Sequence, residues 1–157
     1  MPTAESRGYK RIAAEEAWIT PELMARYQDL LERGDHGDPG FQSLWGFFGR
    51  STSPRARDLF ERVQDMDARR LADMDATGID MQLLMLTSPG VQMFEPQEAC
   101  ALAVSSNDQL AQTIARHPTR FSGLAAFAPH APNEAAKEIE RAVHRLGLKG
   151  ALVNSHT

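Results

Sequence analysis

The sequence is poor in the features that mark several classes of protein. Its single cysteine, Cys100, cannot form a disulfide within the chain, which favours a reduced, cytoplasmic setting. There are 17 basic and 21 acidic residues, a formal net charge of −4, and no lysine- or arginine-rich run. Charge therefore gives no indication of binding to nucleic acid or to an anionic membrane. No apolar stretch reaches the length of a membrane span.

What the chain does contain is an ordinary globular composition, with 42% hydrophobic residues among 157, enough for one domain with a core. Four short, mostly apolar runs are typical of strands in a sheet buried on both faces. The predicted strands cover residues 11–15, 80–86, 121–127 and 149–154.

Helical patterns with marked ends separate these runs. Thr20 followed by Pro21, for example, is typical of an N-cap and a first helical turn. Alternating strands and helices at this spacing predict a parallel α/β sheet joined by right-handed crossovers. The predicted helices cover residues 20–34, 53–78, 96–116 and 132–146.

The segment from about residue 34 to 53 is predicted to be a long loop rich in aromatic side chains. Loops of this length are usually functional or disordered, and the aromatic content argues against disorder. Two interpretations stay open: the rings cap the core, or they form a lid or pocket wall that faces an aromatic ligand. The aromatic and large apolar residues are Phe41, Leu44, Trp45, Phe47 and Phe48.

Two adjacent carboxylates, Glu15 and Glu16, stand where the first apolar run ends. Acids at the end of a buried strand suggest a nearby cation, most simply a divalent metal. Because consecutive residues of a strand point to opposite faces, only one of the two can face such a site. The other is expected to make a supporting or helix-capping contact.

Five motifs in register carry a family resemblance: IAAEEAW at 12–18, SLWGF at 43–47, DMDATGID at 73–80, LTSPGVQ at 86–92 and NSHT at 154–157. Together they resemble the amidohydrolase-related decarboxylases, a family that includes the aminocarboxymuconate-semialdehyde, γ-resorcylate and 5-carboxyvanillate decarboxylases, the last type being the most similar. The resemblance implies a metal-dependent (β/α)8 TIM barrel with its site at the C-terminal ends of the strands. Residues 1–157 would then form its N-terminal half, the first four β/α units.

The same resemblance assigns Glu15 as a metal ligand. In this branch a carboxylate stands where relatives carry a His-x-His pair, and Ala17 falls at the second histidine position. A site rich in carboxylate and water suits Mn²⁺ at least as well as Zn²⁺. The cofactor expected from the resemblance is therefore a divalent metal, Mn²⁺ or Zn²⁺.

Three further residues match substrate-binding positions of the family. Arg55 is expected to hold a carboxylate or phenol substituent with its planar fork, although a solvated arginine is the alternative. Phe48 falls where a relative has tyrosine, so a ring contact would survive without its hydroxyl. Thr87 could offer its hydroxyl to substrate or water, or could cap the local backbone. His156 could make a structural hydrogen bond or serve the site.

The implied reaction is non-oxidative decarboxylation of a small hydroxylated aromatic acid, with protonation of the ring carbon as CO₂ leaves. The family's catalytic groups and other metal ligands belong to its C-terminal half, so no catalytic residue is assigned here. We expect the isolated chain to be an inactive fragment and its full-length parent to be a homo-oligomer. A hydrolase or lactonase on the same scaffold, and a non-catalytic half barrel that pairs with another chain, remain alternatives.

Overall fold

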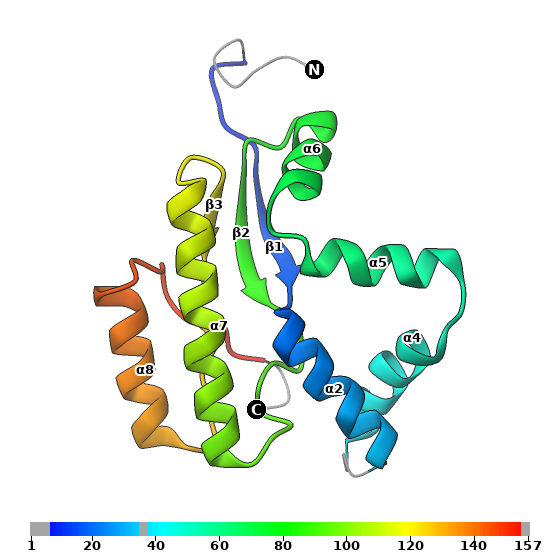
Figure 1. The fold of residues 1–157 in the computed structure, drawn as a ribbon. Coiled ribbons are helices and arrows are strands. Elements are labelled where there is room, and N and C mark those ends of the chain that lie inside the picture. The colour runs from blue at the N-terminus through cyan, green and yellow to red at the C-terminus, as the bar shows by residue number, and fades with distance from the viewer. Residues whose placement is uncertain (1–6, 35–37, 155–157) are drawn as a thin grey trace.

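The computed structural model describes residues 7–34 and 38–154 (Figure 1). Its sheet has three parallel strands in the order β1–β2–β3. A parallel bridge between Ala125 and Ala151 extends the sheet at the place of the predicted fourth strand. The strands are β1 Ile12–Trp18, β2 Met81–Leu86 and β3 Phe121–Gly123.

Helices fill the connections between the strands, as the alternating pattern predicts. Thr20 accepts a hydrogen bond from the backbone of Leu23 at 3.0 Å and so caps the first helix, which ends at Gly34 with φ 68°. The helices are α2 Pro21–Arg33, α3 Pro39–Phe41, the π-helix η1 Gln42–Gly46, α4 Phe47–Arg50, α5 Pro54–Gln64, α6 Ala68–Thr77, α7 Pro96–Arg116 and α8 Pro132–His144.

Two predictions about these connections were wrong. The predicted helix over 53–78 is two helices, because Asp65 ends α5 and its carboxylate accepts the backbone N–H groups of Asp67 and Arg70. The predicted loop at 34–53 is largely helical from Pro39 to Arg50. Asp38 starts this segment by accepting a hydrogen bond from the backbone of Phe41 at 2.7 Å.

The two faces of the sheet differ in their cover. Alternate residues of β2, from Gln82 to Leu86, are buried beneath the helices, whereas the residues between them are half-buried. Helix α7 packs so closely on β3 that a Cβ added at Gly123 would lie 2.6 Å from Leu110 Cδ2. The opposite face is open, and Ile12 on it is 56% exposed. In the (β/α)8 barrel expected from the sequence, this open face would be the interior.

None of the helices within the described ranges is both long enough and apolar enough to cross a membrane.

Candidate metal and substrate site

The C-terminal ends of β1 and β2 lie side by side and form the candidate site. Ala17 pairs with Met85, and Trp18 pairs with Leu86. The residue that follows, Thr87, therefore lies beside the end of β1, with Glu15 only a few residues away. Parallel strands bring their carboxyl ends to one edge, which is where α/β barrels bind their ligands.

The two adjacent acids of β1 face different ways, as consecutive residues of a strand do, and the strand carries an irregularity between Ala13 and Glu16. Glu16 pairs with Leu84, which is buried under the helices. Ala14 and Glu15 together stand opposite Leu83, which lies on the open face. Glu15 is exposed there, and its carboxylate forms no ion pair with any residue the structure describes. It is therefore available to a cation on the open side of the sheet.

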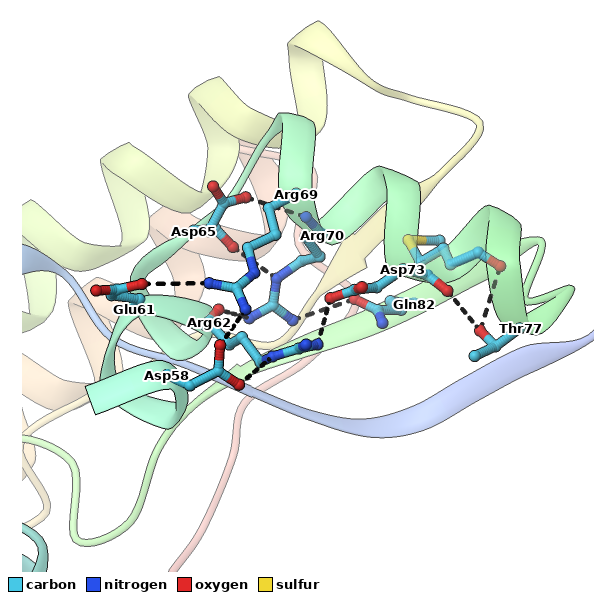
Figure 2. A network of polar contacts seen from close by, with 10 residues as sticks. Asp58, Glu61, Arg62, Asp65, Arg69, Arg70, Asp73, Thr77 and Gln82 are labelled. Carbon is cyan, nitrogen blue, oxygen red and sulfur yellow. Dashed lines mark hydrogen bonds and ion pairs between the residues drawn. The ribbon is translucent and has the colours of Figure 1, made fainter. Parts of the chain in front are cut away.

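Glu16 instead lines a cavity of about 330 Å³ on the helix side, between β1 and the α5–α6 connection. The walls of this cavity are strongly charged, and Figure 2 shows the polar network to which most of these charged residues belong. Its charged lining residues are Glu16, Arg62, Asp65, Arg69, Arg70 and Asp73.

Arg70 is the centre of that network, with an exposed fraction of only 8%. Its guanidinium donates to the carbonyl of Asp65 at 2.7 Å, to Oε1 of Gln82 at 3.1 Å and to the carbonyl of Ala17 at 3.0 Å. Burial lowers the pKa of the guanidinium, while the negative charge of Glu16 acts in the opposite direction. Arg70 thus ties the end of β1 to β2 and to the start of α6.

The predicted substrate residues lie in three different places. Thr87 is half-buried directly after β2, and its hydroxyl has no hydrogen-bond partner within residues 7–34 and 38–154. Phe48 is half-buried and meets Phe60 of α5 edge to face, with 6.4 Å between ring centroids. Arg55 is exposed in the first turn of α5, the end of that helix that lies away from the sheet in Figure 1. No described contact joins Arg55 to Glu15.

Two rings of the aromatic segment, those of Phe41 and Trp45, belong to the core, and the other large side chains are partly or largely exposed. Phe41 and Trp45 are buried and pack edge to face against Tyr27, whereas Phe47 is 70% exposed. The core interpretation therefore holds for Phe41 and Trp45, and the exposed rings do not form a buried pocket wall. Sequence reasoning missed Tyr27 and Arg70 because an isolated tyrosine or arginine on a helix carries no local signal of a distant partner.

The described residues contain no group of three or more histidine, cysteine, aspartate or glutamate side chains that could hold a metal ion. Glu15 fits one position of a hard-cation site, since it offers an exposed carboxylate that forms no ion pair with any described residue. Any further ligands would have to come from outside this part of the chain. His156 lies outside the described residues.

Comparison with known proteins defines the class. The sequence model of the amidohydrolase family matches residues 30–157, and the chain belongs to this family. Over 98 residues it is 43% identical to a γ-resorcylate decarboxylase of Polaromonas sp., a match that covers 62% of this chain and 30% of that protein. The matched part of the chain spans less than a third of the length of the curated relatives of this kind.

Solved structures give a fuller match. A 5-carboxyvanillate decarboxylase from Novosphingobium aromaticivorans, solved with manganese and a nitro-substituted hydroxymethoxybenzoic acid, is 46% identical with a TM-score of 0.95; the match covers all of this chain and 45% of that one. A dihydroxybenzoic acid decarboxylase from Polaromonas sp., solved with manganese and 2-nitroresorcinol, has a TM-score of 0.72 at 34% identity, covering 92% and 38%. The predicted family and fold class are confirmed: the described part is an α/β portion of such a barrel.

Proposed function

We propose that this chain is part of a metal-dependent decarboxylase that removes CO₂ non-oxidatively from a hydroxylated aromatic carboxylic acid. The observation that carries the proposal is the similarity over the whole chain to the manganese-bound 5-carboxyvanillate decarboxylase, at 46% identity and a TM-score of 0.95. A substrate of the 5-carboxyvanillate or γ-resorcylate type follows from the names of the relatives.

Glu15 is the proposed metal ligand of this chain. Its place on the open face of β1, three residues before the C-terminal end of that strand, supports this role, as does the absence of an ion-pair partner among the described residues. Mn²⁺ is the first choice because relatives were solved with manganese, and Zn²⁺ is the second. A bound cation would supply the positive charge that holds the acid and phenol oxygens of the substrate.

The proposed tasks of the other site residues are binding and orientation. The hydroxyl of Thr87, which has no partner among the described residues, can accept or donate a hydrogen bond at the mouth of the site. The ring of Phe48 can pack against an aromatic substrate. Arg55 can form a bidentate contact with a carboxylate, provided that closure of the site or a neighbouring segment brings the start of α5 close to the substrate.

The remaining machinery is proposed to lie outside this chain, which spans 45% of the solved 5-carboxyvanillate decarboxylase. One carboxylate cannot provide a catalytic coordination shell. We expect the 157-residue polypeptide by itself to bind Mn²⁺ weakly and to turn over neither acid. Tight 1:1 binding of Mn²⁺, or CO₂ release by the purified 157-residue chain, would contradict this part of the proposal.

The test uses the full-length polypeptide that contains this chain, loaded with Mn²⁺ and supplied with 5-carboxyvanillate or γ-resorcylate. CO₂ release without ring opening is expected, whereas hydrolysis of a lactone in place of CO₂ release would support the hydrolase alternative. Glu15→Gln should lower metal affinity and turnover together by at least about tenfold, because even residues that only support a ligand contribute that much.

Glu16→Gln is the matched control for this experiment, since it makes the same change one residue further along, on the helix side of the sheet. It should retain the metal content of the unmodified protein. Equal metal content in the Glu15 variant and the unmodified protein would remove Glu15 from the coordination shell. A soluble, defined dimer of the 157-residue chain in sedimentation would instead favour a self-pairing half barrel.

A further inference from the structure

The turn that follows β2 is held by three side chains from three separate segments. Trp45 Nε1 donates to the carbonyl of Ser88 at 3.0 Å. Asn154 Nδ2 donates to the next carbonyl, that of Pro89, at 3.1 Å. Tyr27 donates its hydroxyl hydrogen to the third, that of Gly90, at 2.5 Å. We call this arrangement, residues 88–90 with their three donors, the turn clamp.

Such a concentration of side-chain donors needs an explanation. Loop carbonyls commonly bond to backbone groups or water, and three consecutive ones seldom each receive a side chain from a distant segment. Two of the donors are also buried: Tyr27 is 0% exposed and Trp45 is 6% exposed. A buried tyrosine or tryptophan needs a partner for its polar group, and here both partners are in one turn.

The π-helix η1 carries one of these donors. Phe41 and Trp45 are four residues apart, and both contact Tyr27, at 5.1 and 4.8 Å between ring centroids. Single π-turns within helices often occur at functional sites, because the extra residue re-aims the side chains that follow. Here the turn is part of the continuous helical run from α3 to α4, which includes Phe48.

The clamp therefore connects two of the proposed substrate residues. On one side, the clamped turn is continuous with Thr87, whose carbonyl accepts the backbone N–H of Gly90 at 2.9 Å. On the other, Trp45 stacks on Phe60 at 5.9 Å, and Phe60 meets Phe48 edge to face. Trp45 is thus in contact both with the turn that follows Thr87 and with Phe60, the ring that packs against Phe48. Trp45 itself is not one of the proposed substrate contacts.

We infer that Trp45 is a positioning residue that fixes Thr87 relative to Phe48 and so sets how the aromatic acid binds. Tyr27 supports the same turn from its other end. This inference rests on the proposed function, since it concerns the substrate of that site. It gives a role in substrate specificity to residues of the helical aromatic segment that pack in the core and do not line the entrance to the site.

The test is Trp45→Phe in the Mn²⁺-loaded full-length protein, which removes the donor and keeps an aromatic ring. Misplacing a binding group by a fraction of an ångström to an ångström costs up to about 100-fold, so we expect kcat/KM for the aromatic acid to fall about 10- to 100-fold, mainly through KM. Metal content should not change. The backbone amide of Gly90 should exchange with solvent faster.

Trp18→Phe is the matched control. Trp18 is also buried, at 2% exposure, but its Nε1 has no hydrogen-bond partner among the described groups, so the same change removes no bond. It should lower stability and leave the exchange of Gly90 unchanged. Because the backbone carbonyl of Trp18 accepts the N–H of Thr87, some effect on KM is expected, but one smaller than that of Trp45→Phe. Equal kinetic effects of the two variants would show a general packing effect and overturn the inference.

A double-mutant cycle that combines Trp45→Phe with Thr87→Val is the second part of the test. If Trp45 acts through Thr87, the effect of Trp45→Phe on KM should shrink when the hydroxyl is already absent. Additive effects would overturn the inference. Should Trp45→Phe fail to fold, Tyr27→Phe tests the same turn at its third carbonyl, because it removes only the hydroxyl that donates to Gly90. If the unmodified protein shows no turnover, the proposed function itself is refuted. If the unmodified protein is active and both Trp45→Phe and Tyr27→Phe keep its KM, only the role of the turn clamp is refuted.

Discussion

Replacing Arg70 by methionine should destabilise the fold far more than the same change at its neighbour Arg69. The guanidinium of Arg70 bonds to neutral oxygens of Asp65, Gln82 and Ala17 in the interior. Hydrogen bonds from a charged donor contribute about 1.5 to 3 kcal/mol each, and removing the donor leaves buried acceptors without a partner. The cost of burying the charge and the entry of water into the adjoining cavity offset part of that sum.

We therefore expect a loss of about 2 to 4 kcal/mol in the free energy of unfolding for Arg70→Met. Arg69 pairs instead with the carboxylates of Asp58 and Glu61 at the surface. Exposed ion pairs contribute little, because water and salt screen them and their long side chains lose entropy. Arg69→Met should leave the free energy of unfolding close to that of the unmodified protein.

Urea unfolding followed by tryptophan fluorescence measures both variants, since the two tryptophans, Trp18 and Trp45, are buried. Repeating the titration in 1 M salt, where the Debye length is about 3 Å, should abolish any effect at Arg69 and preserve the effect at Arg70. The reasoning fails if the Arg69 variant is the less stable of the two, or if salt removes the loss at Arg70.

Two further predictions concern the packing of the sheet and the buried tyrosine. Gly123→Ala should destabilise by about 1 to 3 kcal/mol in urea, because its Cβ would lie 2.6 Å from Leu110 Cδ2. Gly49→Ala, with its nearest contact at 3.4 Å, should be neutral or slightly stabilising, and equal losses at both sites would contradict this. Burial raises the pKa of Tyr27 above that of an unfolded tyrosine, about 10, so the native state keeps a proton that the unfolded chain loses. Stability should therefore fall as pH rises above about 10, and Tyr27→Phe should flatten that slope in unfolding curves measured from pH 8 to 11; an unchanged slope would refute the assignment.

Local signals in the sequence determined much of the fold. Thr20 as N-cap and the glycine at position 34 mark the two ends of α2, and the short apolar runs mark the strands. The sequence reveals these features because they act through neighbours only a few residues away. The alternation of side chains along a strand likewise predicts that Glu15 and Glu16 face different ways. The motifs of the family added the class of fold to which these elements belong.

The predicted strand ends are wrong where the paired stretch is longer or shorter than the apolar run in the sequence. The first strand continues to Trp18, beyond its predicted end, because β2 beside it offers partners up to Leu86. The third strand is shorter than predicted and ends at Gly123. Within the described residues, a single bridge, at Ala151, forms in the predicted fourth strand. An apolar run shows where a strand can form, but the backbone of a neighbour decides how far it extends.

Only the tertiary structure decided what the polar and aromatic side chains do. An arginine on a helix is ordinarily solvated, and nothing around Arg70 in the sequence indicates that Gln82 and Ala17 will surround it. In the same way, Trp45 donates to the carbonyl of Ser88 only because the fold brings the π-helix η1 next to the turn that follows β2. The sequence by itself therefore determined the order of elements and the pair of acids in β1 that face opposite sides of the sheet. Contacts between residues far apart in the chain decided which groups hold that site in place, since burial and partner geometry exist only once the chain has folded.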